Sequence, residues 1–223
     1  KKALSIIDCV TSIGACNVPV DEWELDIVAS GSQKGYMIPP GLSFVSISQK
    51  AWRASEDSNL PKFYLNLKSY KKSLLSNSNP YTPAVNLVFA LDEALKMMKD
   101  EGLDSIFERH KKHKLAVSEA AKTLNLKLFA DKRHLSPSVT AIQTKDIDAE
   151  EFRKIIKKKY DILLAGGQDH LKGKIFRVGH LGYINDRDII AVIAAIGNTL
   201  VELNKISTEK VGEALKIASF HVK

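Results

Sequence analysis

The segment Gly31-Ser32-Gln33-Lys34-Gly35-Tyr36-Met37-Ile38-Pro39-Pro40-Gly41 sets a lysine among small and turn-forming residues. Apolar runs flank it at residues 27–29 and 44–47, and their length and composition predict buried strands joined by a tight connection. Lys34 should therefore leave a rigid scaffold and enter a partly dry site. Removing an ammonium group from water favours the neutral amine, which is a nucleophile for carbonyl compounds. The alternative is an ordinary surface lysine, since the chain has 33 Lys and Arg residues.

A carboxylate at the end of an earlier apolar run favours the first interpretation. Residues 3–7 predict a buried strand that ends at Asp8, and the segment between this strand and the lysine turn, with Asp26, looks exposed. A buried carboxylate is costly and needs a cationic partner. A strand-end aspartate and a lysine in a turn are the pair that a pyridoxal phosphate enzyme requires, the lysine for the aldehyde and the aspartate for the pyridinium nitrogen.

Five groups of short motifs along the chain strengthen this hypothesis. They are Asp8-x-Val10-x-Ser12-x-Gly14, Gly31-Ser32-Gln33-Lys34 with Pro39-Pro40-Gly41, Tyr81-Thr82-Pro83, Leu91-x-Glu93-Ala94-Leu95, and Gly166-Gly167 with Gly173-Lys174-x-x-Arg177-x-Gly179. With these motifs in register, the chain resembles the class V aminotransferases of PLP fold type I, in the alanine–glyoxylate and serine–pyruvate branch. The resemblance covers nearly the whole chain. It implies an α/β fold that comprises the C-terminal part of a large mixed-sheet domain and a smaller α/β domain.

The resemblance also implies a cofactor, pyridoxal 5'-phosphate, and the residues that hold it. Lys34 matches the lysine that forms the Schiff base and moves the substrate proton. Asp8 matches the partner of the pyridinium nitrogen, Gln33 a ligand of the phosphate, and Val10 another cofactor-contacting position. The implied reaction is transamination of a small α-amino acid, alanine or serine, with glyoxylate or pyruvate as the acceptor.

Further positions are implied to bind the substrate or a second subunit. Ser12 matches a residue that lines the substrate pocket, and Arg177 matches the clamp for the substrate carboxylate. Thr82 matches a threonine that reaches the cofactor phosphate of the neighbouring subunit, which implies a homodimer. Asn79 stands where the family usually has a tyrosine.

Arg177 can also be interpreted without the resemblance. It lies in the middle of an apolar run at residues 175–178, so a strand would place it on a face shared with Ile175 and Gly179. A guanidinium group there needs an anion, because it stays charged and its fork matches a carboxylate. The alternative to a substrate carboxylate is a structural ion pair with Asp186 or Asp188.

Composition narrows the functional classes. The 223-residue chain is 44% hydrophobic and carries a net charge of +7. The lysines are spread over predicted helix faces and interleaved with acidic residues, so nucleic-acid binding is not expected. There is no run long enough for a membrane span and no metal-ligand spacing, and two cysteines fit a reducing compartment. We expect a soluble cytoplasmic protein.

A change of composition at residues 100–102 predicts a domain boundary, which assigns residues 1–101 to the large PLP-binding domain and residues 102–223 to the small domain. Ser48 is expected to cap a short helix, Pro83 to begin the next one, and Asp148 to cap a third. Strands are expected at residues 126–130, 139–143, 162–164 and 175–178. His110 and His113 lie on a lysine-rich helix and are expected to be surface or half-buried residues.

Three other functions stay open at this stage. A lyase or a cysteine desulfurase of the same superfamily would use the same Asp8 and Lys34, although a desulfurase needs a cysteine on a mobile loop. An inactive fragment could serve as an interaction domain. No strand-to-helix turn that could cradle a phosphate precedes Asp8, so we expect the chain to be the C-terminal part of a longer polypeptide.

Overall fold

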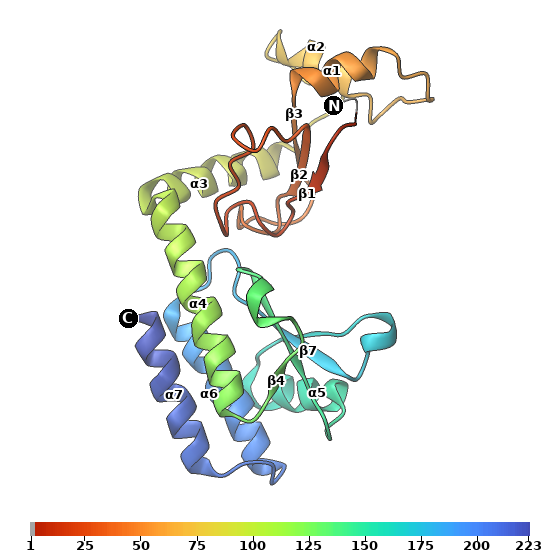
Figure 1. Cartoon of the computed structure of the whole chain (residues 1–223). Coiled ribbons are helices and arrows are strands. Elements are labelled where there is room, and N and C mark those ends of the chain that lie inside the picture. Colours follow the sequence, from red (N-terminus) through yellow and green to blue (C-terminus); the bar gives the residue numbers. More distant parts are fainter. Residues whose placement is uncertain (1–2) are drawn as a thin grey trace. The chain divides into compact units, whose positions relative to one another are not determined.

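The computed structural model describes residues 3–223. It divides into two compact units (Figure 1). The first comprises Lys1–Ile13 and Val18–Asp100, and the second comprises Gly14–Asn17 and Glu101–Lys223.

The first unit contains a three-stranded sheet in the order β1-β2-β3 (Figure 1). Strand β1 spans Ile6–Asp8, β2 spans Ile27–Gly31 and β3 spans Ser43–Ile47. β1 and β2 run parallel, with Asp8 opposite Ala29, whereas β2 and β3 run antiparallel. Because parallel strands point the same way, the chain leaves β1 and β2 at the same edge of the sheet.

The predicted strands form, but the expectation that they are buried is wrong for two of them. Ile6 in β1 is 70% exposed and Val45 in β3 is 44% exposed, while β2 alternates and buries only Val28 and Ser30. The reason is that an apolar run indicates a strand but not what covers its faces. Among the described residues, little packs against β1 and β3.

The helices of the first unit are α1 (Gln49–Glu56), α2 (Leu67–Leu74) and α3 (Val85–Glu101). Ser48 caps α1 as predicted, because its side chain accepts a hydrogen bond from Ala51 N. Helix α2 is not anticipated by the sequence analysis. Its cap is Asn66, whose side chain accepts a hydrogen bond from Lys68 N. Asn66 lies inside the run Phe63-Tyr64-Leu65-Asn66-Leu67, whose pattern does not indicate the start of a helix.

The expectation that the segment with Asp26 is exposed is wrong for this residue, because Asp26 is only 4% exposed. Lys50 Nζ lies 2.8 Å from Oδ2, Ser5 N donates to the same oxygen at 2.9 Å, and Ser48 Oγ donates to Oδ1 at 2.9 Å. These hydrogen bonds, above all the one from Lys50, lower the pKa of Asp26 to about 2. Asp26 thereby ties the segment before β1 to the start of β2 and to α1.

The second unit contains a four-stranded antiparallel sheet in the order β4-β5-β7-β6. Strand β4 spans Lys127–Leu128, β5 Val139–Gln143, β6 Ala165–Gly166 and β7 Ile175–Gly179. The strand predicted at residues 162–164 is therefore wrong. Those aliphatic residues precede β6, and Leu164 is buried against the core.

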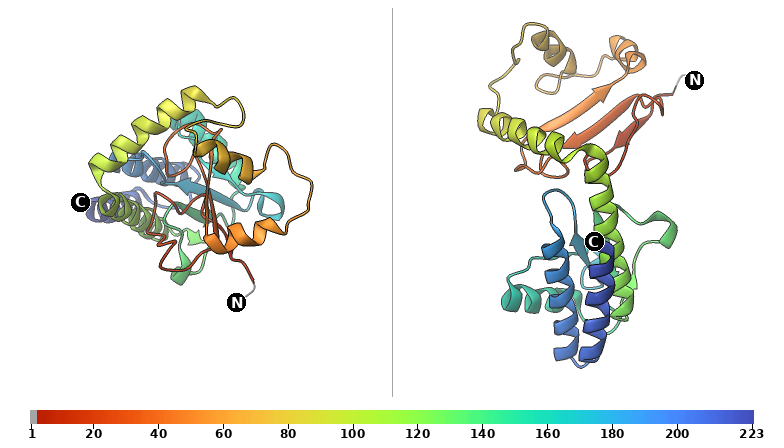
Figure 2. Two further views of the ribbon diagram at one scale, coloured as in Figure 1. Left: turned by 90° about the horizontal axis from the view of Figure 1, so that it is seen from above. Right: turned by 90° about the vertical axis from the view of Figure 1, so that its left-hand side faces the viewer.

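Helices supply most of the second unit's core. They are α4 (Leu103–Thr123), α5 (Ala149–Tyr160), α6 (Asp186–Glu202) and α7 (Thr208–Val222), with short 3-10 turns η1 (Lys132–His134) and η2 (Asp169–Leu171). Within this unit, α4, α6 and α7 lie side by side (Figures 1 and 2). Asp148 caps α5 as predicted, and Phe152 of α5 packs on Phe176 of β7 with ring centroids 5.2 Å apart.

His110 and His113 are both completely buried, which corrects the expectation of surface or half-buried positions. His110 Nδ1 lies 2.7 Å from Ile106 O, and Gly182 N donates to His110 Nε2 at 3.2 Å, so the proton of the neutral ring is on Nδ1. His113 Nε2 lies 2.9 Å from Asp186 Oδ1. Both histidines are buried because α6 and α7 pack beside α4. The part of α4 that faces solvent is therefore narrower than the distribution of its lysines suggests.

A third histidine of this unit, His180, is also fully buried, with Nε2 2.9 Å from Thr140 Oγ1. Burial lowers the pKa of His110 and His113, and it lowers that of His180 to about 4. These rings are therefore neutral in the folded protein at neutral pH.

The two units should lose stability to acid in different pH ranges. A group whose folded pKa lies below its unfolded pKa stabilises the fold at high pH, and this contribution is lost as pH falls. For His180 the loss runs from about pH 6.5 down to about 4 and amounts to roughly 3 kcal/mol. For Asp26 it runs from about pH 4 down to about 2. Denaturant titrations over pH should therefore show acid weakening the second unit first.

Two optical signals separate the units. Both tryptophans, Trp23 and Trp52, belong to the first unit, so their fluorescence reports that unit alone, whereas far-UV circular dichroism reports helices of both. His180→Asn should flatten the pH dependence seen by dichroism between pH 6.5 and 4, and Asp26→Asn should flatten the lower range seen by fluorescence. Coincident acid transitions in both signals would contradict this assignment.

Candidate active site

The carboxyl end of β1 carries the first predicted site residues. Asp8 ends the strand, and its Oδ1 accepts a hydrogen bond from Val10 N at 2.8 Å. Cys9 N donates to Ala29 O at 2.9 Å, which extends the pairing with β2 by one residue. The turn that carries Val10 and Ser12 therefore begins at the sheet edge, with Asp8 exposed there.

The loop that follows β2 is closed by a serine. Ser32 is 0% exposed, and its Oγ donates to Pro39 O at 2.8 Å and accepts from Leu42 N at 3.1 Å. Its backbone N donates to Leu42 O at 3.1 Å. One buried side chain thus joins the beginning and the end of the loop, and Lys34 lies half-buried between them.

Backbone constraints inside the loop add to its rigidity. Met37 has a φ of 63°, a left-handed conformation that is uncommon for a long side chain, and its N donates to Lys34 O at 3.0 Å. Gly41 has a φ of 143°, and a Cβ there would lie 2.5 Å from Leu87 Cδ1 on α3. Only glycine fits this position, so the loop returns to β3 along a single path.

The structure brings Val10 and Gln33 together beside Gly31. A Cβ built on Gly31 would lie 3.1 Å from Gln33 Oε1 and 3.9 Å from Val10 Cγ1. The missing side chain therefore leaves room for both residues at the end of β2. Asp8, Val10, Gln33 and Lys34 accordingly share the edge at which β1 and β2 end.

The other two predicted residues of the first unit lie in different surroundings. Ser12 is half-buried in the turn after β1, with its N donating to Cys9 O at 3.1 Å. Thr82 is exposed, three residues before α3 begins. It follows Tyr81, whose ring packs 4.8 Å from that of Tyr64 and whose hydroxyl donates to Phe63 O at 3.1 Å.

Arg177 belongs to the second unit, on β7. Its Nε donates to Gly166 O at 2.9 Å on the neighbouring strand β6. Within residues 3–223 its terminal nitrogens make no hydrogen bond or ion pair. The alternative of a structural ion pair is not realised, because Asp186 contacts His113 and Asp188 accepts from Asn185 N. The half-buried guanidinium thus keeps its outer edge available for an anion.

A second arginine, Arg153, binds the segment directly before β6. Arg153 Nε donates to Leu164 O at 2.7 Å, and its Nη1 lies 2.8 Å from Glu150 Oε2. A Cβ on Gly166 would lie 2.5 Å from Glu150 Oε1, so a larger residue there would displace the ends of these two side chains. Arg153 therefore holds Leu164, which lies two residues before the carbonyl group that accepts from Arg177.

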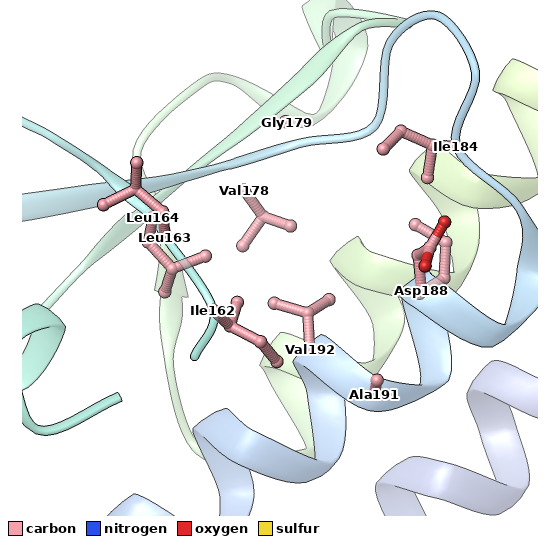
Figure 3. A pocket seen from close by; sticks show the side chains of 10 residues that line it. Ile162, Leu163, Leu164, Val178, Gly179, Ile184, Asp188, Ala191 and Val192 are labelled. Atoms are coloured by element: carbon pink, nitrogen blue, oxygen red, sulfur yellow. The ribbon is translucent and has the colours of Figure 1, made fainter. Parts of the chain in front are cut away.

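The aliphatic cavity of the second unit offers no catalytic group. It has a volume of about 270 Å³ and lies between the segment before β6, β7 and α6, whose side chains face one another (Figure 3). Its one ionisable residue, Asp188, already accepts from Asn185 N in the cap of α6. This cavity is best explained as a gap in aliphatic packing.

Sequence reasoning missed Ser32 as a structural residue of the site. Serine is common in turns, so nothing in the sequence distinguishes Ser32 from the other small residues of this segment. Only the structure shows that Ser32 continues the alternation in which Val28 and Ser30 are buried. Arg153 was missed because an i,i+3 pair with Glu150 on a helix normally indicates a solvated face.

Residues 3–223 contain neither a cluster of metal-ligating side chains nor a helix that could cross a membrane. No group of three or more His, Cys, Asp or Glu side chains is placed to hold a metal ion. No helix in this part of the chain combines the length and apolarity that crossing a bilayer requires.

Comparison with known proteins places this geometry in context. The family model described as Aminotransferase class-V matches residues 1–180. A protein named soluble hydrogenase, small subunit, from Synechococcus sp. is 55% identical over 202 residues, which are 91% of this chain and 53% of that protein. A serine–glyoxylate aminotransferase from Methylorubrum extorquens is 34% identical over 207 residues, which are 90% of this chain and 52% of that protein.

Solved structures agree with the family model. The crystal structure of a ureidoglycine–glyoxylate aminotransferase from Bacillus subtilis superposes with a TM-score of 0.90 at 29% identity, over 98% of this chain and 58% of that chain. The chain thus spans about half the length of the curated relatives it matches.

Ser32 provides a test of the loop geometry. Ser32→Ala removes the buried hydroxyl and with it the hydrogen bonds with Leu42 N and Pro39 O, so the free energy of unfolding should fall by about 1–3 kcal/mol. Tryptophan fluorescence during denaturant titration measures this loss in the unit that contains the loop. Ser46→Ala, at an exposed position of β3, is the matched control and should change the stability by less than about 0.5 kcal/mol. Equal effects of the two substitutions would show that Ser32 does not close the loop.

Proposed function

Because the chain belongs to the class V aminotransferase family, we propose that it supports pyridoxal phosphate-dependent transamination of a small α-amino acid, alanine or serine, with glyoxylate or pyruvate as the acceptor. One observation carries the proposal. Asp8 and the loop of Lys34 follow neighbouring parallel strands, so an acid and an amine stand at one sheet edge. The fold is that of the PLP fold type I aminotransferases, of which the chain covers about half.

The residues present fit the family's cofactor, pyridoxal phosphate. The donor set of the edge is a carboxylate, a primary amine and an amide, which suit a pyridinium nitrogen, an aldehyde and a phosphate respectively. Gly31 leaves open the space that its Cβ would fill between Gln33 and Val10. In this proposal Lys34 binds the aldehyde of the cofactor and Asp8 binds its pyridinium nitrogen. Gln33 binds the phosphate, and Val10 contacts the ring.

When bound, pyridoxal phosphate supplies an aldehyde that captures amines and a ring that stabilises negative charge at the substrate Cα. Lys34 would hold the cofactor through its aldehyde, and its Nζ would act as the general base that takes the proton from the donor's Cα. The rigid loop matters here, because a general base must stay within hydrogen-bonding reach of the proton it moves. Asp8 keeps the ring nitrogen protonated through its negative charge.

Arg177 and Ser12 are proposed to select the substrate. The guanidinium of Arg177 has its terminal nitrogens available and is oriented by Gly166 O, so it can bind a substrate carboxylate through two hydrogen bonds. Overall, the amino group of the donor passes to the acceptor: alanine and glyoxylate, for example, yield pyruvate and glycine. Glyoxylate as acceptor is supported by the names of the M. extorquens and B. subtilis proteins.

We also propose a homodimer in which Thr82 reaches the cofactor phosphate of the partner. Thr82 is exposed, and the aromatic contacts of Tyr81 with Tyr64 and Tyr70 fix the segment that presents it. Phe63 and Leu65 nearby are 80% and 79% exposed, which leaves an apolar surface that a second subunit would cover.

A cysteine desulfurase is the less favoured alternative. That chemistry needs a reactive thiolate on a mobile segment. Cys9 is buried beside β2, and burial raises the pKa of the Cys16 thiol, which favours the unreactive protonated form. A lyase would use Asp8 and Lys34 in the same way and differs in its products, so product analysis separates it from a transaminase.

Lys34→Ala should abolish covalent attachment of the cofactor and transamination while leaving the fold intact, because Ser32 and Gly41 hold the loop. Borohydride reduction in the presence of pyridoxal phosphate, followed by peptide mass spectrometry, should locate the label on Lys34 in the natural protein. Lys72→Ala on the exposed face of α2 is the control and should keep the label. A label on another lysine would refute the assignment.

The same samples should be assayed for hydrogen-dependent dye reduction, because the Synechococcus relative is named a hydrogenase subunit. Alanine and serine are then compared as donors with glyoxylate and pyruvate. Dye reduction that survives Lys34→Ala, together with no transamination by either protein, would contradict the proposed function.

Arg177→Leu should raise the KM for the amino donor and lower kcat/KM by a factor corresponding to about 2–4 kcal/mol, because the substrate carboxylate loses its counter-ion. Borohydride labelling of Lys34 should persist in this variant. Arg187→Leu, at an exposed position of α6 in the same unit, should leave KM within about twofold. An unchanged donor KM in Arg177→Leu, with reduced thermal stability, would assign this arginine a structural role.

A further inference from the structure

A groove in the second unit collects positive charge away from the residues discussed so far. It has a volume of about 890 Å³ and lies between the end of α4, β4, η1 and the segment after β5. Its charged lining residues are Lys122, Lys127, Asp131, Lys132, Arg133 and Lys145. We call it the basic groove.

Part of this charge is balanced within the protein. Arg133 Nη2 lies 2.9 Å from Asp131 Oδ2 and Arg133 Nε lies 3.2 Å from Asp131 Oδ1. This pairing lowers the pKa of Asp131. Lys122 Nζ lies 2.5 Å from Glu119 Oε1, in the last turn of α4 where the helix dipole also favours a cation.

The other three cations have no such explanation. Lys127, Lys132 and Lys145 make no hydrogen bond or ion pair within residues 3–223, and all three are exposed. Lys145 is brought to the groove by the antiparallel pairing of β4 with β5, in which Lys127 lies opposite Gln143. Three like charges gathered in one concave surface create a positive potential that a multivalent anion would neutralise.

The floor of the groove limits the kind of anion. Leu126, Leu128 and Ala130 line it, and no aromatic side chain does. Single-stranded nucleic acid is bound by stacking bases on aromatic rings, so the groove lacks what that class of ligand needs. Its volume lies in the range of small-molecule sites, about 300–1,000 Å³.

We propose that the basic groove binds a small molecule that carries a chain of two or three phosphate groups. Lysines serve as point charges for phosphate oxygens, and three of them would neutralise most of the charge of a di- or triphosphate. The apolar floor can take an organic body attached to the chain. The sources to be distinguished are an inorganic polyphosphate and a nucleotide, which share this chemistry.

Titration calorimetry with inorganic tripolyphosphate, ATP and AMP tests the proposal on the full chain. Tripolyphosphate and ATP should bind, AMP should bind at least about tenfold more weakly, and added salt should weaken all three. Tighter binding of ATP than of tripolyphosphate would show that the floor holds the organic body, and equal binding would show that phosphate alone is recognised.

Two matched variants locate the site. Lys127→Gln, Lys132→Gln and Lys145→Gln combined should weaken tripolyphosphate binding by about tenfold or more, since each exposed pair contributes modestly. Lys157→Gln, Lys158→Gln and Lys172→Gln remove the same charge from exposed positions of the same unit and should change the Kd by less than about threefold. An equal loss of affinity in both variants would show that binding depends on net charge alone and would contradict a site in the groove. Binding that survives in the groove variant, or a short DNA duplex that binds more tightly than ATP, would overturn the proposal.

Discussion

The parallel pairing of β1 with β2 is the constraint on which the candidate site depends. Asp8 pairs opposite Ala29, and this register makes both strands end at the same edge, so a residue early in the chain and a loop more than twenty positions later share one surface. A shift of one residue in this register would turn every side chain of the strand to the opposite face. Asp26 secures the arrangement from the other end, because its hydrogen bonds join the segment before β1, the start of β2 and α1.

The second unit holds Arg177 by a different kind of contact. Arg177 lies on β7, an inner strand of the sheet, and the carbonyl oxygen of Gly166 on the edge strand β6 accepts the hydrogen bond from its Nε. A carbonyl oxygen orients a guanidinium group without cancelling its charge. Arg133 differs, because the carboxylate of Asp131 at 2.9 Å neutralises its charge. Two arginines of one unit therefore differ in whether a carboxylate of the protein already pairs with them.

The sequence indicates the fold class, the lysine loop and most helices, because these depend on local patterns. Ser48 and Asp148 cap helices where the pattern predicts, and residues 139–143 form β5 with the predicted bounds. Burial was harder to predict, because it depends on elements far away in the chain. His110 and His113 are covered since α6 and α7 pack beside α4, and Asp26 is covered since Lys50 and Ser48 return to it from α1. Neither event has a signature within a short window of residues.

The exposed strand β1 has a practical consequence. It lies at the end of the strand order, with Ile6 70% exposed and Ile7 37% exposed, and an open edge of this kind is a template for pairing with another chain. Within residues 3–223, the outer edge of β1 is therefore a surface to which a further strand can add.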